Sequence, residues 1–265
     1  MIKGLIVTDL DGTLLDTRGA YSEETRDYLR HLSSCGYLVV LASGRPYRSM
    51  RHLYDDLQCT GPLIAYNGGL VFHPKDPSFP RYEKRFNRQD VIHIREQSLD
   101  CVDVYMAESE TNLYVQGDGS GLFPYFPDKG IHLVEGDIVN ILKEDPFTAL
   151  FHEIEKEEGR LERICREHPN VLYRSWSNSN YSELALPNVH KGSALAYIMK
   201  TYGIHKEDVI AFGDASNDAE MLSEAGRPFA MKNARATWLK DLYPITKNAV
   251  EEDGVIVELK RLLTD

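Results

Sequence analysis

Short apolar runs bounded by glycine and polar residues recur in the first third of the chain and again after residue 208. Runs of this length predict buried strands, because a strand that is covered on both faces is apolar along its whole length. We expect such strands at residues 5–7, 37–42, 63–66, 209–212 and 229–231, with a shorter one at 243–246. The Gly12 that follows the first run is typical of the turn at a strand end.

Helix-prone segments separate these strands. Ser22 precedes two acidic residues, which is an N-cap signal, and Gly36 stands where a helix usually ends. Pro46 fits the first turn of the next helix. We expect helices at residues 22–34, 46–57, 191–202, 217–224 and 234–239, and from 254 onward. Strands and helices that alternate through short connections indicate an α/β fold with a doubly wound, mainly parallel sheet.

The segment between residues 83 and 187 has a different pattern. Polar and apolar positions alternate at 102–106 and 111–116, which predicts strands, and a charged run from Glu153 to Arg166 predicts a helix. We therefore expect a separate α+β domain at 83–187. It is inserted into one core domain formed by residues 1–82 and 188–265.

Composition limits the possible partners. The chain has 265 residues and a formal net charge of −11, which argues against a nucleic-acid surface. No apolar segment approaches the length of a membrane span, so we expect no membrane partner. Four scattered cysteines without a C-x-x-C pair predict a reduced, cytoplasmic protein rather than a zinc site. The oligomeric state stays open.

Polar residues with possible chemistry fall at the predicted element boundaries. They are the pair Asp9 and Asp11, the Ser43-Gly44 turn, Lys191, and the segment 213–218 with Asp214. The carboxyl ends of strands in a doubly wound sheet converge on one crevice. Carboxylates there suit a hard cation, and Mg²⁺ is favoured because it combines a few carboxylates with phosphate oxygens. A hydroxyl, helix N-termini and a lysine can hold the phosphate itself.

Each of these features alone has a plain structural explanation. Ser43-Gly44 could be an ordinary turn, Lys191 a solvated lysine at a helix start, and Asp214 a loop residue. Their occurrence together, each at an element boundary, favours a site for phosphate-ester chemistry. That reaction needs a nucleophile, an acid or base, and positive charge acting together.

The chain resembles the haloacid dehalogenase (HAD) superfamily, specifically its Cof-type phosphatases with a large C2-type cap. Four motifs carry the resemblance, namely D-L-D-G-T-L at 9–14, S-G-R at 43–45, K-G at 191–192 and G-D-A-S-N-D-A-E-M at 213–221. The motifs cover the core, whereas the insertion matches only by its position between the second and third motifs. Two departures, Lys232 and the segment 187–190, lie outside the catalytic groups.

The resemblance implies a Rossmann-like core and a role for each motif residue. Asp9 is the expected nucleophile, and Asp11 is the expected general acid and base. Mg²⁺ is expected at the Asp9 carboxylate, the Asp11 carbonyl and Asp214, with Asp218 as nearby support or a further ligand. Arg45 is either a contact to substrate or cap, or an ordinary surface arginine. The expected phosphoryl-binding residues are Leu10, Ser43, Gly44, Lys191 and Asn217.

The implied function is magnesium-dependent hydrolysis of a small phosphate monoester, such as a sugar phosphate, through an aspartyl-phosphate. A sugar phosphomutase is the alternative on the same core, because Asp11 is compatible with both outcomes. A non-catalytic phosphate-binding protein would have lost Asp9, Asp11 or Lys191, and all three are present. A membrane ion pump with this core is excluded by the lack of apolar spans.

Overall fold

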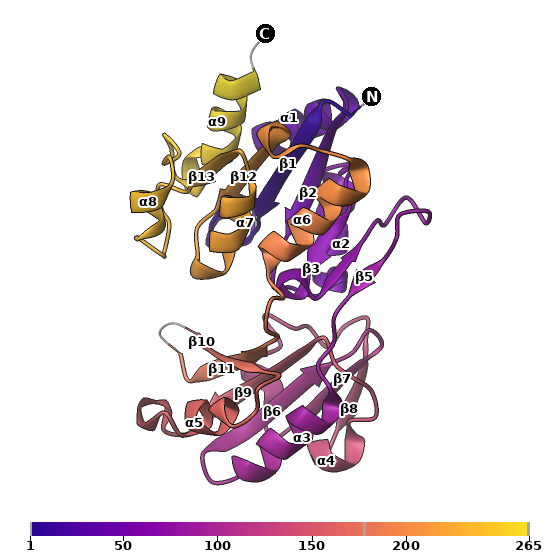
Figure 1. Cartoon of the computed structure of the whole chain (residues 1–265), viewed down its shortest axis with the longest axis vertical. Coiled ribbons are helices and arrows are strands. Elements are labelled where there is room, and N and C mark those ends of the chain that lie inside the picture. Colours follow the sequence, from indigo (N-terminus) through magenta and orange to yellow (C-terminus); the bar gives the residue numbers. More distant parts are fainter. Residues whose placement is uncertain (1, 177–178, 264–265) are drawn as a thin grey trace. The chain divides into compact units, whose positions relative to one another are not determined.

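The computed structural model describes residues 2–176 and 179–263 (Figure 1). The chain forms two compact units. Residues Met1–Glu83 and His190–Asp265 make the first, here the core unit, and Lys84–Val189 make the second, here the inserted unit. The expected insertion covers residues 83–187.

A seven-stranded sheet forms the centre of the core unit, in the order β13-β12-β1-β2-β3-β4-β5. The five strands from β13 to β3 are parallel, and β4 and β5 extend the sheet as antiparallel strands. The strands are β1 (Gly4–Asp9), β2 (Tyr37–Ala42), β3 (Leu63–Ala65), β4 (Leu70–Phe72), β5 (Tyr82–Glu83), β12 (Val209–Gly213) and β13 (Arg227–Ala230).

Helices cover both faces of this sheet. They are α1 (Glu23–Ser34), α2 (Tyr47–Asp56), α6 (Lys191–Tyr202), α7 (Ala219–Glu224), α8 (Leu239–Leu242) and α9 (Gly254–Leu263). The connections β1-α1-β2 and β12-α7-β13 run in opposite directions along the sheet, so right-handed crossovers place α1 and α7 on opposite faces. In Figure 1, α6 and α7 lie in front of the strands, over the face that carries Leu5 and Val7. The predicted doubly wound α/β fold is confirmed.

Local signals set several of these element ends. The Ser22 side chain accepts a hydrogen bond from the Thr25 amide at 3.0 Å, which caps α1 as the sequence indicates. Gly203 has a left-handed φ of 65° and ends α6. The strand predicted at 37–42 and the helix predicted at 191–202 coincide with β2 and α6.

Three predicted elements differ from the structure. The residues from Ala234 onward form turns before the short α8, because the amide of Ala236 donates to the Asp214 carbonyl at 3.0 Å instead of starting a helix. The strand predicted at 243–246 is reduced to a single bridge between Ala230 and Ile245. In the charged run from Glu153, a left-handed Gly159 delays the helix to residue 160.

The inserted unit has a six-stranded sheet in the order β10-β11-β9-β6-β7-β8, antiparallel except for the pair β7 and β8. Its strands are β6 (Val102–Glu108), β7 (Asn112–Gln116), β8 (His132–Glu135), β9 (Thr148–Glu153), β10 (Leu172–Ser175) and β11 (Tyr181–Ala185). Its helices are α3 (Arg88–Gln97), α4 (Ile138–Ile141) and α5 (Arg160–Arg166). The three helices contribute Ile94, Ile138 and Leu161 to one apolar cluster with Phe151 of the sheet.

The cysteines Cys35, Cys59, Cys101 and Cys165 are all free thiols. Within the described ranges, no helix combines the length and the apolar character needed to cross a lipid bilayer.

Gly68 lies close to the backbone at the start of α6. It has a φ of 102°, and a Cβ atom added there would lie 2.4 Å from the His190 carbonyl oxygen, directly before α6. Gly19 has a similar φ of 73° but open space around it. We predict that Gly68→Ala lowers the free energy of unfolding by roughly 3 kcal/mol and Gly19→Ala by only about 1 kcal/mol. Urea unfolding of both variants measures this, and equal losses would contradict the steric role of Gly68.

Candidate active site

The carboxyl ends of three neighbouring strands bring the polar segments together. Asp9 is the last residue of β1 and pairs with Ala42, the last residue of β2. On the other side of β1, Thr8 pairs with Phe212 of β12. The residues that follow these strand ends therefore lie next to one another at one edge of the sheet. This is the point where the winding direction reverses and where ligands bind in such folds.

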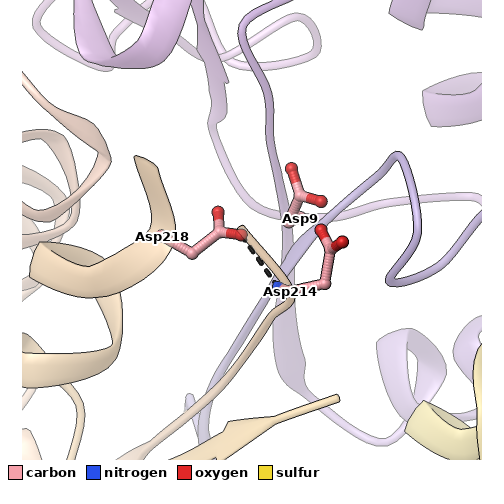
Figure 2. A group of neighbouring side chains, drawn as sticks. All are labelled: Asp9, Asp214 and Asp218. Atoms are coloured by element: carbon pink, nitrogen blue, oxygen red, sulfur yellow. Dashed lines mark hydrogen bonds between the residues drawn. The ribbon is translucent and has the colours of Figure 1, made fainter. Parts of the chain in front are cut away.

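Three aspartates meet at this edge (Figure 2). One carboxylate oxygen from each of Asp9, Asp214 and Asp218 lies within 4.8 Å of those of the other two, and all three side chains are buried. The Asp218 Oδ2 atom accepts hydrogen bonds from the backbone amides of Asp214 and Ala215, both at 2.9 Å. The loop after β12 is therefore held in shape by hydrogen bonds from its backbone to the side chain of Asp218, which belongs to the same loop.

Lys191 joins two of these carboxylates. Its Nζ atom donates to Asp9 Oδ1 at 2.5 Å and to Asp218 Oδ1 at 2.6 Å, and its side chain has no exposed surface. The lysine is the first residue of α6, and Gly192 allows that helix to approach α7 closely. A Cβ atom at Gly192 would lie 2.5 Å from the carbonyl oxygen of Glu220.

Arg235 binds the third carboxylate. Its Nε atom donates to Asp214 Oδ2 at 2.7 Å and its Nη2 atom to Asp214 Oδ1 at 3.1 Å, the paired geometry that arginine forms with carboxylates. The same Nη2 atom donates to the backbone carbonyl of Asp11 at 3.0 Å. Asp214 is fully buried, whereas the Arg235 side chain is 65% exposed.

The charges in this cluster do not balance, since three carboxylates face only two cations, Lys191 and Arg235. Burial raises the pKa of Asp9 to about 8, with further increases from the charges of Asp218 and Asp214, while Lys191 acts in the opposite direction. Burial also raises the pKa of Asp214, although Arg235 acts against the shift. Burial alone would lower the pKa of Lys191, but the two carboxylates raise it above its usual range. The cluster therefore attracts further positive charge.

Asp11 lies beyond the end of β1, so the alternation of strand side chains does not place it beside Asp9. Its carboxylate is about half exposed and binds Arg45 instead. Arg45 Nε donates to Asp11 Oδ2 at 2.9 Å, and Arg45 Nη2 donates to Asp11 Oδ1. For Arg45, the sequence left open a contact to substrate or cap and a surface position. The structure places the side chain on Asp11.

The residues expected to hold a phosphoryl group lie around the same strand ends. The Ser43 hydroxyl accepts from the Arg45 amide at 3.1 Å, which fixes the turn that contains Gly44. Asn217 Nδ2 donates to Asn67 Oδ1 at 2.9 Å. Leu10 is fully buried, and its carbonyl accepts from the amides of the next turn, at residues 13–15. These contacts hold the phosphoryl-binding candidates in a fixed local geometry.

One atom of Asp9 fits a role as a metal ligand. Asp9 Oδ2 is buried and, among the described residues, has no hydrogen-bond partner. A buried carboxylate oxygen without a partner is unfavourable unless something else binds it. Together with the Asp214 carboxylate and the Asp11 carbonyl, it offers the oxygen donors that a hard divalent cation such as Mg²⁺ prefers. The residues present therefore fit the metal that the family resemblance implies.

Two features of this site were not predicted from the sequence. Arg235 was not predicted, and its only sequence signal is a basic residue in the loop after a strand end. Asn67 was also not predicted as a site residue; it contacts Asn217 and has a left-handed φ of 53°, next to Tyr66 at 51°. Two adjacent non-glycine residues with positive φ are strained, and such strain is common at functional sites.

Comparisons with known proteins agree with this geometry. The family model for haloacid dehalogenase-like hydrolases matches residues 6–259. A 5-amino-6-(5-phospho-D-ribitylamino)uracil phosphatase from Bacillus subtilis is 32% identical over 97% of this chain and 96% of its own length. A second B. subtilis phosphatase with the same substrate name is 27% identical over 95% of this chain and 92% of its own length. A haloacid dehalogenase-like hydrolase from Bacteroides thetaiotaomicron has a TM-score of 0.84 at 24% identity, over 98% and 99% of the two chains.

This chain belongs to the haloacid dehalogenase-like hydrolase family, which confirms the resemblance carried by its four motifs. It is an enzyme of the phosphatase class within that family.

The raised pKa of Asp9 predicts a pH dependence of stability in metal-free buffer. The unfolded chain releases the Asp9 proton near pH 4, whereas the folded protein keeps it up to about pH 8. The free energy of unfolding should therefore fall as the pH rises between these values, and Asp9→Asn should remove much of the decline. Urea unfolding at pH 5 and pH 8 with EDTA measures it. Asp27→Asn, on the exposed side of α1, is the control and should keep the decline. An unchanged decline in Asp9→Asn would contradict the assignment.

Proposed function

We propose that this chain is a magnesium-dependent phosphatase that hydrolyses small phosphate monoesters through an aspartyl-phosphate on Asp9. The observation that carries the proposal is the state of the Asp9 carboxylate. One of its oxygens is held by Lys191 at 2.5 Å, and the other is buried without a hydrogen-bond partner among the described residues. A carboxylate with one oxygen beside Lys191 and the other free to bind a cation, next to two further buried acids, suits a nucleophile at a cation site.

Asp9 attacks phosphorus, and the bond from phosphorus to the leaving oxygen breaks. Asp11 gives its proton to that oxygen and later takes one from the water that hydrolyses the aspartyl-phosphate. In the structure Arg45 binds both oxygens of this carboxylate, which stays about half exposed, so Asp11 takes up and gives a proton once the guanidinium has moved away. Asp11 thus acts as acid and base without being part of the buried cluster.

The transferring phosphoryl group is held by groups of the core unit. Lys191 provides positive charge, and the Ser43 hydroxyl and Asn217 amide provide hydrogen-bond donors, together with the backbone amides of Leu10 and Gly44. Asp218 acts through Lys191, since its carboxylate fixes the Nζ atom at 2.6 Å and also closes the loop after β12. The resemblance left Asp218 as support or a further metal ligand, and these contacts favour support.

Magnesium would be held by the Asp9 and Asp214 carboxylates and the Asp11 carbonyl. When bound, it would neutralise negative charge on the phosphoryl oxygens. The relatives support a substrate class, since two of them are named for a phosphorylated ribitylamino-uracil. We infer that the substrate is a phosphate ester of a small sugar or sugar alcohol. The phosphorylated ribitylamino-uracil is the first compound to test. The four free thiols support action in the reducing cytoplasm.

The proposal is tested by measuring free phosphate and isomer formation from a panel of sugar phosphates and from the ribitylamino-uracil ester. A phosphatase releases inorganic phosphate at the rate at which the ester disappears. Formation of an isomeric sugar phosphate without free phosphate would instead identify a phosphomutase.

Substitutions at the two catalytic aspartates should have different effects. We predict that Asp9→Asn lowers kcat by roughly four orders of magnitude or more for every ester, because an amide is a poor nucleophile. Asp11→Asn should lower kcat about 10²- to 10⁴-fold for sugar phosphates but much less for p-nitrophenyl phosphate, whose leaving group needs no proton. Asp27→Asn again serves as the control. Equal losses for both ester types in Asp11→Asn would contradict its role as general acid.

Removal of the metal should abolish the activity of the enzyme. We predict that EDTA abolishes phosphate release, that Mg²⁺ restores it, and that Ca²⁺ restores little of it, because Ca²⁺ adopts larger and looser coordination that would misplace the phosphoryl group. The measurement is phosphate release after dialysis against each metal in turn. Full activity in metal-free buffer would show that the aspartate cluster has another purpose.

A further inference from the structure

Arg235 occupies the oxygen atoms that the proposed function assigns to the metal. Its three hydrogen bonds go to both carboxylate oxygens of Asp214 and to the carbonyl oxygen of Asp11, at 2.7 to 3.1 Å. These are two of the three groups proposed as magnesium ligands. Lone pairs that accept hydrogen bonds from a guanidinium are not free to coordinate a cation in the same geometry.

The burial of Asp214 explains why a protein cation lies here. The Asp214 side chain has no exposed surface, and an unpaired buried carboxylate is strongly destabilising. Its neighbour Lys191 is already bound to Asp9 and Asp218. Arg235 therefore supplies the counter-charge that Asp214 needs when no metal is present.

Arg235 is also positioned so that its side chain can move away from Asp214. Its side chain is 65% exposed and extends from the loop between β13 and α8 rather than from the packed core. An arginine stays charged at every physiological pH, so it can be displaced only by another cation and not by losing a proton. Solvent can rehydrate the guanidinium once it has moved away from Asp214.

We propose that Arg235 is the resident cation of the metal site, which holds the Asp214 carboxylate and the Asp11 carbonyl until magnesium displaces it. This inference rests on the proposed magnesium site. Arg235 stabilises the metal-free fold, weakens magnesium binding by competition, and thereby sets the metal concentration at which the enzyme becomes loaded. It is a positioning residue rather than a catalytic one, since it acts on the metal ligands and not on the ester.

The test compares the wild type with Arg235→Gln by isothermal titration of the metal-free proteins with MgCl₂. Removing the competing hydrogen bonds should tighten magnesium binding by roughly 10- to 100-fold. Arg235→Lys keeps the charge but not the paired geometry, so its affinity should lie between the two. Lys232→Gln is the matched control. It removes one positive charge from the same loop, its contact is with Glu252 at 3.9 Å, and its affinity should stay within about twofold of the wild type.

Thermal unfolding provides a second readout that does not depend on turnover. In EDTA, Arg235→Gln should unfold at a lower temperature than the wild type, because Asp214 loses its partner. In saturating MgCl₂ the difference should disappear or reverse, since the metal replaces the guanidinium. Lys232→Gln should follow the wild type in both buffers.

The possible results separate this inference from the proposed function. Tight and equal binding by the wild type and Arg235→Gln, or weaker binding by the variant, overturns the role of Arg235 and leaves the magnesium site standing. If Arg235→Gln binds magnesium and the wild type binds it weakly or not at all, the result supports competition between Arg235 and the metal. Absence of binding in both proteins overturns the inference together with the proposed magnesium site.

Discussion

The site depends on the burial of more negative than positive charge at the ends of β1 and β12. Carboxylates are normally kept out of protein interiors, because removing them from water is costly unless each finds a partner. Here Asp218 is satisfied by two backbone amides and Lys191, and Asp214 is satisfied by Arg235. Asp9 has a hydrogen-bond partner for only one of its two oxygens among the described residues, and burial together with the nearby Asp218 carboxylate raises its pKa.

The topology of the sheet makes this arrangement possible. Asp9 and Lys191, which form a buried ion pair in this cluster, are 182 positions apart in the sequence. They meet because β1 lies between β2 and β12, and because α6 begins at the lysine itself. The charged groups therefore come from strand ends and helix starts, whose positions are fixed by backbone pairing. Such groups need little rearrangement before they act on a substrate.

The sequence predicts the parts of the fold that depend on local signals. The apolar run of β2, the Ser22 cap of α1 and the Gly203 end of α6 can be recognised from the residues alone. The motif aspartates and Lys191 could be placed at one sheet edge because parallel strands share that edge. How their side chains pair could not be predicted, since the contact of Asp11 with Arg45 joins positions 34 apart.

In the loop after β13, too, the structure could not be predicted from local sequence signals. Its residues have helical propensity, yet the amide of Ala236 and the side chains of Asn233 and Arg235 are bound to the site. Asn233 donates to the Gly12 carbonyl at 2.7 Å and accepts from the Val250 amide at 3.0 Å, so one side chain joins three distant segments. These tertiary contacts override local propensity, which explains why the helix predicted at 234–239 is absent.

In the proposed mechanism, Asp9 itself carries the phosphoryl group. The most direct test is to quench the enzyme with acid during turnover of a sugar phosphate, reduce it with borohydride, and map the product by mass spectrometry. Borohydride converts an aspartyl-phosphate to homoserine, so homoserine is expected at position 9 and only when substrate is present. Homoserine at another aspartate, or none at any aspartate while phosphate is being released, would contradict it.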